Sequence, residues 1–263
     1  MMKMQIDKQF IDELQGKQTL VTGGAKGIGA SVVKFLQKKG RKVIVIDKEN
    51  GIDIRDKEKV EDFIKKIPSL EGLVLNAALG PLHKNPTEIF ETNIMGTMNI
   101  LNACNRKLSK FSSVIIVAST AGYRKKWDKK WLEILDTENT ISFDYKSEIK
   151  KFSSKECYGL TKWLLIQATK KFSKEFAFRK IRVNCVVPGP TRTSMSKNLW
   201  QSNNKAWQKI VFESPFKIAN EPENVANLIV FLLSEDAKMI TGSFVHIDGG
   251  WFCKNVMGEE LCK

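Results

Sequence analysis

Hydrophobic residues follow two alternating patterns along this chain. Short apolar runs lie at 18–22, 43–46, 72–75, 114–117, 181–187 and 243–247, and between them apolar residues recur at helical spacing. Continuous apolar runs, unlike alternating ones, are typical of parallel strands that are covered on both faces. The alternation therefore predicts an α/β fold of the doubly wound (Rossmann) type, with helices on both faces of a parallel sheet.

The expected helices lie around 32–36 and at 60–67, 87–108, 156–179 and 222–233. We see no repeat, linker or shift in composition, so residues 1–263 are expected to form one domain. Two segments interrupt the alternation, at about 123–155 and at about 190–220. Long excursions of this kind lie above the carboxyl ends of strands, where ligands bind, so the second is a candidate substrate loop. In the first, Trp127, Trp131, Ile134 and Leu135 have helical spacing, which predicts an inserted amphipathic helix.

Composition limits the class of protein. The net charge is +14 and the pI is about 9.5, but the lysines are spread along the chain and no nucleic-acid-binding motif is present, so a solvated basic surface is expected. A basic field could also attract a pyrophosphate cofactor. The N-terminal ten residues do not resemble a signal peptide, and no apolar run has transmembrane length. Five scattered cysteines without a CxxC pair indicate free thiols and a soluble, cytoplasmic protein (Cys104, Cys157, Cys185, Cys253 and Cys262).

A glycine-rich loop joins the first strand to the first helix, with the sequence Gly23-Gly24-Ala25-Lys26-Gly27-Ile28-Gly29. Its glycines permit a tight turn and allow backbone N–H groups to approach a pyrophosphate at a helix N-terminus. The spacing is Gly-x-x-x-Gly-x-Gly, and an ordinary glycine turn is the alternative. The position between a strand and an amphipathic helix favours a dinucleotide site.

Asp47 ends the second strand, 18 residues after Gly29. A carboxylate there can accept hydrogen bonds from both ribose hydroxyls and repel a 2′-phosphate, which favours NAD over NADP. Lys26 argues in the other direction, and Asp47 could simply be a turn residue. Asp53-Ile54 could meet the adenine edge, and Asn76-Ala77-Ala78 could pass over the ribose.

Tyr158 and Lys162 lie four positions apart in an expected helix, so their side chains share one face. A nearby cation is expected to lower the pKa of the phenol, which would make an acid/base group usable near neutral pH. Such a pair also occurs by chance on solvated helices. Ser119 ends a strand and faces the same crevice, where its hydroxyl could bind a substrate oxygen; a turn-forming serine at a strand end is the alternative.

Three further features complete the set. Asn93 is a polar residue on a helix with an otherwise apolar face, and Pro188-Gly189-Pro190-Thr191-Arg192-Thr193 could turn the chain against a nicotinamide. The two histidines, His83 and His246, lie far apart, so no metal site is expected and hydrolase chemistry lacks its base.

Together these residues resemble the short-chain dehydrogenase/reductase family, over about residues 15–252. The long separation of Ser119 from Tyr158 and the run at 72–81 look like the bacterial 3α-hydroxysteroid dehydrogenase/carbonyl reductase group. The matching motifs are Thr22-Gly23-x-x-x-Gly27-Ile28-Gly29, Asp47, Asp53, Asn76-Ala77-Ala78, Asn93, Ser119, Tyr158-x-x-x-Lys162, Pro188-Gly189-x-x-x-Thr193 and Asp248-Gly249-Gly250.

The resemblance implies a role for each residue. Tyr158 would exchange a proton with the substrate oxygen, Lys162 would lower its pKa and hold the nicotinamide ribose, and Ser119 would orient the substrate. Asn93 would hold a water that links Lys162 to solvent. The cofactor site would comprise Gly23, Ala25, Lys26, Gly27, Ile28, Gly29, Asp47, Asp53, Ile54, Asn76, Ala77, Ala78, Tyr158, Lys162, Pro188, Gly189, Thr191 and Thr193.

The chain departs from the family pattern at two places. Ala78 stands where the family has glycine, and Ser119 and Tyr158 are 39 positions apart, much farther than in most members. The extra residues are expected to form a partner interface, a substrate lid or both. A homodimer or homotetramer is expected.

The expected function is an NAD(H)-dependent oxidoreductase that interconverts a secondary alcohol and a ketone. A hydroxysteroid or another bulky hydrophobic substrate is favoured by the aromatic residues Trp200, Trp207, Phe212 and Phe216. The alternative, motivated by the charge, is a dinucleotide-binding sensor or nucleic-acid-associated protein without turnover. The complete set of Asn93, Ser119, Tyr158 and Lys162 argues against it.

Overall fold

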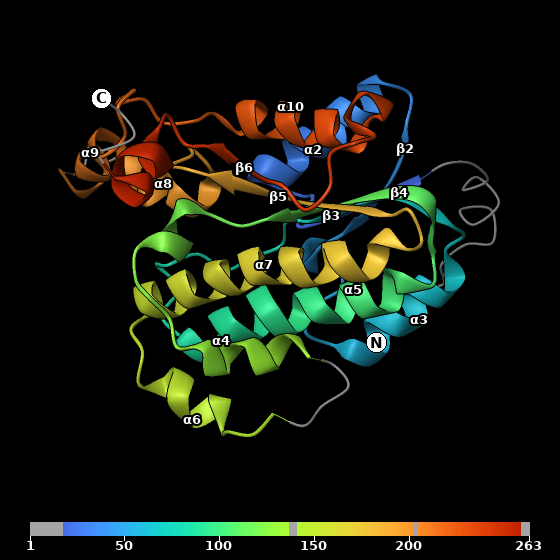
Figure 1. Ribbon diagram of the computed structural model, residues 1–263, viewed down its shortest axis with the longest axis horizontal. Coiled ribbons are helices and arrows are strands. Elements are labelled where there is room, and N and C mark those ends of the chain that lie inside the picture. Colours follow the sequence, from blue (N-terminus) through green and yellow to red (C-terminus); the bar gives the residue numbers. More distant parts are fainter. Residues whose placement is uncertain (1–17, 137–140, 202–204, 259–263) are drawn as a thin grey trace.

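The computed structural model describes residues 18–136, 141–201 and 205–258 (Figure 1). Six parallel strands form one sheet in the order β2-β1-β3-β4-β5-β6, so the doubly wound fold is confirmed. The expectations for the N-terminal ten residues and for Cys262 lie outside the described residues. The strands are β1 (Gln18–Thr22), β2 (Lys42–Ile46), β3 (Leu70–Leu75), β4 (Leu108–Val117), β5 (Arg182–Pro188) and β6 (Phe244–Ile247).

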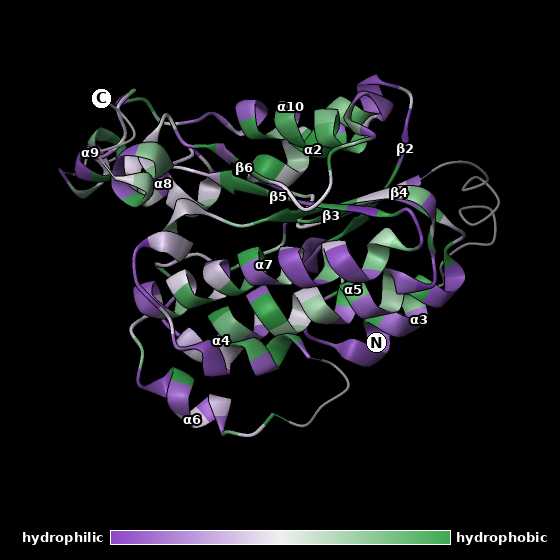
Figure 2. Ribbon diagram, in the orientation of Figure 1, coloured by the Kyte–Doolittle hydropathy of each residue, from purple (hydrophilic) through white to green (hydrophobic). Residues whose placement is uncertain are grey.

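Helices cover both faces of the sheet. Helices α2 (Gly27–Lys38) and α10 (Pro222–Leu233) pack on one face, and α3 (Lys57–Lys66), α5 (Thr97–Asn105) and α7 (Ser154–Ala177) pack on the other (Figure 1). Figure 2 shows hydrophobic residues concentrated on the strands and on the helix faces turned toward them. No helix within the described ranges is both long enough and apolar enough to cross a membrane.

The helix expected at 87–108 contains an irregular turn. It consists of α4 (Pro86–Phe90), a π-helical turn η2 (Glu91–Gly96) and α5, and it ends at Asn105. Ile54 packs so closely on Gly96 that a Cβ there would lie 2.6 Å from Ile54 Cγ1. Strand β4 begins at Leu108, six residues earlier than the apolar run that predicted it.

The inserted segment differs from the expected amphipathic α-helix. After the 3₁₀ turn η3 (Thr120–Tyr123), it contains one 3₁₀ helix, η4 (Lys129–Leu135), and one short α-helix, α6 (Tyr145–Lys150). The Trp131 ring is buried, with its centroid 5.8 Å from that of Phe90 in α4 and 5.1 Å from that of Phe143. The apolar side of the segment therefore packs on α4 and α7 of its own chain.

The candidate substrate loop is more ordered than its sequence indicated. It contains the 3₁₀ turn η5 (Ser194–Ser196) and the short helices α8 (Lys197–Trp200) and α9 (Lys205–Phe212). Three further single turns lie elsewhere: η1 (Lys48–Asn50), η6 (Glu235–Ala237) and η7 (Cys253–Met257). Of the four described cysteines, Cys253 is exposed, and the buried Cys104, Cys157 and Cys185 are free thiols.

Candidate active site

The candidate site lies at the carboxyl ends of the central strands. Because the strands are parallel, the residues that follow β1, β3, β4 and β5 meet at one edge of the sheet. The chain order reverses between β1 and β3, which is the point where α/β sheets bind ligands. These residues are Gly23, Asn76, Ser119 and Gly189.

The glycine loop is held against the segment that follows β3. The Thr22 hydroxyl accepts hydrogen bonds from the backbone N–H groups of Asn76 (3.0 Å) and Ala77 (3.1 Å), and Asn76 Nδ2 donates to the carbonyl of Gly23 (3.1 Å). A Cβ on Gly29 would lie 2.0 Å from the Gly23 oxygen. Sequence reasoning had placed Thr22 in the motif but gave it no role, and its position directly after the strand was the available signal.

The loop fits a dinucleotide pyrophosphate. Gly23 and Gly27 have φ angles of +66° and +54°, which side chains disfavour, and α2 begins at Gly27 with its first N–H groups unpaired within the helix. These donors and the positive end of the helix form an anion cradle. A Cβ on Gly27 would lie 3.3 Å from Thr193, so the segment after β5 closes the same cradle.

Asp47 lies beside the loop, as expected. Its Oδ2 accepts a hydrogen bond from the N–H of Ala25 (3.1 Å) and its Oδ1 accepts one from the N–H of Glu49 (3.1 Å). Lys26, the residue that argued for NADP, forms an ion pair with Glu49. The positive charge of Lys26 is therefore paired with the carboxylate of Glu49, a residue that the sequence pattern did not identify.

Basic side chains bind the Asp53 carboxylate, and its expected adenine contact stays a prediction. Arg55 binds its carboxylate through Nη2 (2.7 Å) and Nε (3.0 Å), and Lys48 Nζ lies 3.3 Å away. Burial opposes ionisation of Asp53, but the hydrogen bonds from Arg55 and Lys48 outweigh it and lower the pKa to about 2. Ile54 is buried against Gly96. An adenine contact through this carboxylate would have to share it with Arg55.

Tyr158, Lys162 and Ser119 meet at the end of β4. Lys162 is only 3% exposed, its Nζ donates to the carbonyl of Val117 (3.1 Å), and it lies 5.5 Å from the centre of the Tyr158 ring. Ser119 shares a side-chain hydrogen bond with Tyr158 and accepts another from the N–H of Ala121 (3.2 Å). The predicted grouping of these three side chains is therefore present.

The expected lowering of the Tyr158 pKa is wrong for the chain without cofactor. Burial raises the pKa of Tyr158 to about 12, and the hydrogen bond from Ser119 only partly opposes it. Burial also lowers the pKa of Lys162 to about 8. Helical spacing correctly places the ammonium near the phenol, but a shared dry environment disfavours both charges.

Asn93 is fully buried in the π-turn η2. Its Oδ1 accepts from the N–H of Leu79 (2.7 Å), and its Nδ2 donates to the carbonyl of Leu79 (3.1 Å) and to Thr161 Oγ1 (3.1 Å). Asn93 thus ties the segment after β3 to α7, one residue before Lys162. Its expected water-holding role stays a prediction.

The segment after β5 covers the crevice from the other side. A Cβ on Gly189 would lie 2.9 Å from Asp248 Cα, and one on Gly80 would lie 2.5 Å from the Met195 side chain. Thr191 Oγ1 donates to the carbonyl of Gly189 (3.0 Å), which fixes the turn. Gly189 therefore packs on the segment after β6, and Met195 in η5 reaches the segment after Ala78.

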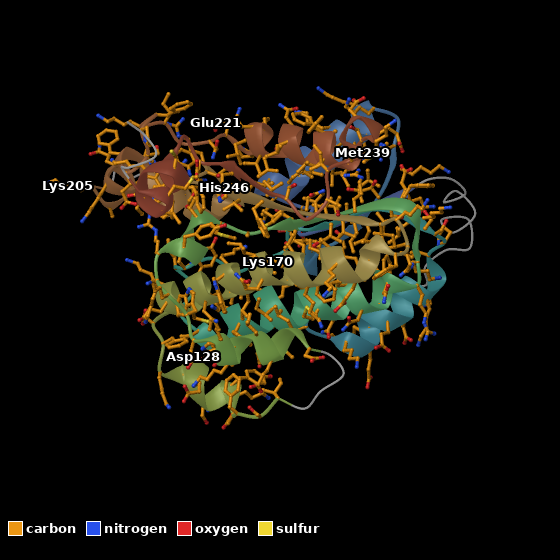
Figure 3. The ribbon with its side chains drawn as sticks, viewed as in Figure 1. Asp128, Lys170, Lys205, Glu221, Met239 and His246 are labelled. Atoms are coloured by element: carbon orange, nitrogen blue, oxygen red, sulfur yellow. The ribbon has the colours of Figure 1, made fainter. Side chains whose placement is uncertain are left out.

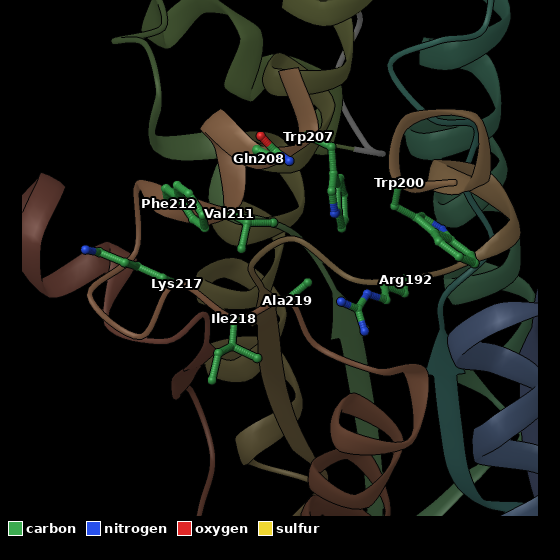
Figure 4. Close-up of a pocket in the computed structure, with 9 residues that line it drawn as sticks. All are labelled: Arg192, Trp200, Trp207, Gln208, Val211, Phe212, Lys217, Ile218 and Ala219. Atoms are coloured by element: carbon green, nitrogen blue, oxygen red, sulfur yellow. The ribbon is translucent and has the colours of Figure 1, made fainter. Parts of the chain in front are cut away.

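A pocket of about 500 Å³ lies within the candidate substrate loop (Figure 4). The indole rings of Trp207 and Trp200 form its walls, and Arg192 lies beside them. Of the four aromatic residues expected to hold substrate, only Phe216 is absent from the lining, and it is 72% exposed. The lining contains none of Asn93, Ser119, Tyr158 and Lys162. It consists of Arg192, Trp200, Trp207, Gln208, Val211, Phe212, Lys217, Ile218 and Ala219.

Gly29→Ala is expected to abolish nucleotide binding. The new methyl group would overlap the Gly23 carbonyl, so the turn must open and its N–H groups lose their alignment. We expect the free energy of unfolding to fall by more than about 2 kcal/mol. Titration of dinucleotide by calorimetry measures the binding loss.

Gly40→Ala is the matched control for Gly29→Ala. Gly40 has a positive φ (+71°), but a Cβ there would meet open space. This variant should lose about 1 kcal/mol of stability and bind nucleotide like the wild type. Normal nucleotide affinity in Gly29→Ala would contradict the assigned cradle.

Comparisons with known proteins agree with this geometry. A family model described as enoyl-(acyl carrier protein) reductase matches residues 136–252. The chain is 30% identical over 259 residues to 3-oxoacyl-(acyl-carrier-protein) reductase FabG of Aquifex aeolicus, covering 91% of this chain and 99% of that protein. It is 28% identical over 272 residues to dehydrogenase/reductase SDR family member 4 of Mus musculus, covering 90% and 88%.

Solved structures show the same fold. The 3-alpha-hydroxysteroid dehydrogenase from Pseudomonas sp. B-0831, solved in complex with NADH, superposes with a TM-score of 0.76. The sequences are 24% identical, and the match covers 90% of this chain and 97% of that one.

Proposed function

The chain belongs to the short-chain dehydrogenase/reductase family of nicotinamide-dependent oxidoreductases, and we propose that it uses NAD(H) to interconvert a secondary alcohol and a ketone. One observation carries the proposal. A buried lysine, a phenol and a serine hydroxyl meet beside a glycine cradle that fits a pyrophosphate. This arrangement supplies a proton and a hydrogen-bond donor next to a dinucleotide.

Each side chain has a separate task in this proposal. The bound dinucleotide supplies or accepts the hydride. Tyr158 donates its phenolic proton to the substrate oxygen during reduction and takes it back during oxidation, while Ser119 donates a hydrogen bond that orients that oxygen. Lys162 places a positive charge 5.5 Å from the phenol ring and stabilises the phenolate left after proton transfer.

Two carboxylates support the choice of NAD. Asp47 and Glu49 lie at the end of β2, and the second neutralises Lys26. A 2′-phosphate would meet this negative charge without a free cation from Lys26 to offset it. We therefore infer that NAD is preferred over NADP.

Asp47→Ser is expected to lower kcat/KM with NADH by about 10- to 100-fold, because the ribose loses hydrogen bonds to a charged acceptor. The loss with NADPH should be smaller. The matched control is Glu49→Gln, which frees Lys26 and should raise the NADPH rate while leaving the NADH rate near that of the wild type. An unchanged ratio of the two cofactors in Asp47→Ser would remove this role of Asp47.

The proposed substrate class is a bulky hydrophobic ketone or alcohol, with a hydroxysteroid as the leading candidate. The resemblance to the 3α-hydroxysteroid dehydrogenase/carbonyl reductase group supports it, as do the indole walls of the pocket in the substrate loop (Figure 4). Since relatives are named as 3-oxoacyl reductases, an oxoacyl thioester is the second substrate to test. A homodimer or homotetramer in the cytoplasm, where both cofactors are available, is part of the proposal.

The test is oxidation of NADH and NADPH by the purified chain against a panel of steroid ketones, other hydrophobic ketones and oxoacyl thioesters. Turnover of a ketone with NADH supports the proposal. If no carbonyl turns over and the chain binds dinucleotide only, the sensor alternative is favoured.

A further inference from the structure

Three large apolar side chains protrude at the edge of the sheet opposite the crevice. Phe111 is 62% exposed, Phe178 is 91% exposed and Met239 is 87% exposed. Phe111 lies in the first part of β4, and Phe178 follows the last residue of α7. In Figure 1 this edge is on the right, where β4 begins and α7 ends, and Figure 3 labels Met239 toward the same side.

Hydrogen bonds hold the two phenylalanines in place. The N–H of Phe111 donates to the carbonyl of Lys180 (3.1 Å). Phe111 and Lys180 have positive φ angles of +71° and +57°. Arg179 donates to the carbonyls of Asn105 (2.9 Å) and Leu108 (2.7 Å), so the turn that carries Phe178 is fixed to β4. A positive φ is unfavourable for a bulky residue, and here it keeps an aromatic ring in solvent.

Met239 is connected to the same turn. Arg182 Nη1 donates to the carbonyl of Ile240 (3.3 Å), and its Nη2 donates to the carbonyl of Ser234 (3.2 Å). The strand that follows Phe178 therefore anchors the loop that carries Met239.

Lysines lie beside the Phe111 ring and close in sequence to Phe178 and Met239. The ammonium groups of Lys110 and Lys180 lie 5.2 and 5.9 Å from the centre of the Phe111 ring. Lys174 is exposed in the last turn of α7, and Lys238 directly precedes Met239. The acidic residues near them in the sequence are Glu175, Glu235 and Asp236. We call this surface the basic edge; it comprises Phe111, Phe178, Met239, Lys110, Lys174, Lys180 and Lys238.

Helix geometry explains only part of this surface. Lysines at helix C-termini are favoured by the helix dipole, and helices α2, α3 and α7 all end at this edge with lysine in the last turn. The dipole gives no reason for exposed phenyl and thioether groups among them. Protruding apolar groups ringed by lysines are typical of proteins that bind a lipid surface.

We propose that the basic edge docks on a lipid bilayer that carries anionic headgroups. A bilayer fits these side chains better than a nucleic acid does, because Met239 has no ring for base stacking and the apolar groups protrude instead of lining a groove. Docking in this orientation leaves the crevice at the opposite end, open to water and to a soluble cofactor. The proposal does not depend on the proposed enzymatic function.

The test is cosedimentation of the full chain with vesicles of phosphatidylcholine alone and of equimolar phosphatidylcholine and phosphatidylglycerol. The wild type should sediment with the anionic vesicles and stay in the supernatant with the neutral ones. Phe178→Ser and Phe111→Asn should each weaken vesicle binding about tenfold. Asparagine is chosen at position 111 because it tolerates a positive φ. Lys110→Gln and Lys180→Gln should each weaken it about fivefold.

The matched control is Phe231→Ser, which removes an exposed phenyl ring (44%) from α10 on another face and should bind like the wild type. Phe178 is almost fully exposed, so its variant tests docking without disturbing the core. The proposal is overturned if the wild-type protein does not sediment with anionic vesicles. It is also overturned if Phe178→Ser binds them as strongly as the wild type does. Binding of single-stranded RNA but not vesicles, lost in the same variants, would assign the edge to nucleic acid.

Discussion

Tyr158→Phe is expected to lower kcat/KM for ketone reduction by about 10²- to 10⁴-fold, the range that a positioned proton donor supplies. The variant keeps the ring beside Lys162 and removes only the hydroxyl group that Ser119 contacts. Nucleotide affinity should stay within a few-fold of the wild type, because the glycine cradle is unchanged. Steady-state rates and calorimetric titration with NADH measure the two quantities separately.

Tyr145→Phe is the matched control for this variant. Tyr145 begins α6 and packs on Phe90, with ring centroids 5.4 Å apart, and it has no place in the proposed chemistry. Its removal should leave kcat/KM unchanged. Equal turnover by Tyr158→Phe and the wild type would rule out the assigned mechanism while leaving family membership intact.

Lys162→Met is expected to reduce activity and raise stability together. Burial lowers the pKa of Lys162 from 10.5 to about 8, so the folded state resists its positive charge. Converted by the free energy of a pKa shift, this burial penalty is on the order of 3 kcal/mol, and losing the hydrogen bond to Val117 offsets about 1 kcal/mol of the gain. At pH 7 the variant without cofactor should be about 2 kcal/mol more stable, and at least about a hundredfold less active.

The pH dependence of this stability difference has a definite sign. Below about pH 8 the amine is charged in both the folded and unfolded states, so the wild type carries the whole penalty. Between about 8 and 10.5 the unfolded chain binds more protons than the folded one, so wild-type stability rises with pH relative to the variant. The burial penalty should vanish above that window. Denaturant unfolding of both proteins at several pH values measures the difference in their free energies of unfolding.

Lys170→Met is the control for this series. Lys170 lies two turns further along α7, is exposed, and is labelled in Figure 3. Its removal should change neither activity nor the pH dependence of unfolding. The burial argument would be contradicted if Lys162→Met is less stable than the wild type at pH 7 and if this stability difference does not change with pH.

Much of the fold was predictable because the signals were local and strong. Short, largely apolar runs identified all six strands, and Pro222–Leu233 was predicted to the residue because its proline and its apolar face mark a helix clearly. The glycine loop placed α2 and, with it, the cradle. The grouping of Ser119, Tyr158 and Lys162 followed from the place of Ser119 at a strand end, the helical spacing of the other two and the family resemblance.

Other features depend on contacts that the sequence does not reveal. The pKa shift of Tyr158 follows from three-dimensional burial, and helical spacing carries no information about that burial. The ion pair of Lys26 with Glu49 and the binding of Asp53 by Arg55 depend on how a short turn places its side chains. The inserted segment has an apolar face at helical spacing, yet its seven central residues form a 3₁₀ helix packed on Phe90.

The π-turn Glu91–Gly96 has an evolutionary consequence. A π-turn is an α-helix that has accommodated one additional residue, and the addition rotates every later side chain by about 100° relative to the earlier ones. In this chain the turn carries Asn93, whose amide reaches Leu79 and Thr161 at once. A single point substitution cannot create that orientation in a regular helix, since it requires an insertion. The history of this site should therefore be sought in chain-length changes of one residue as well as in substitutions.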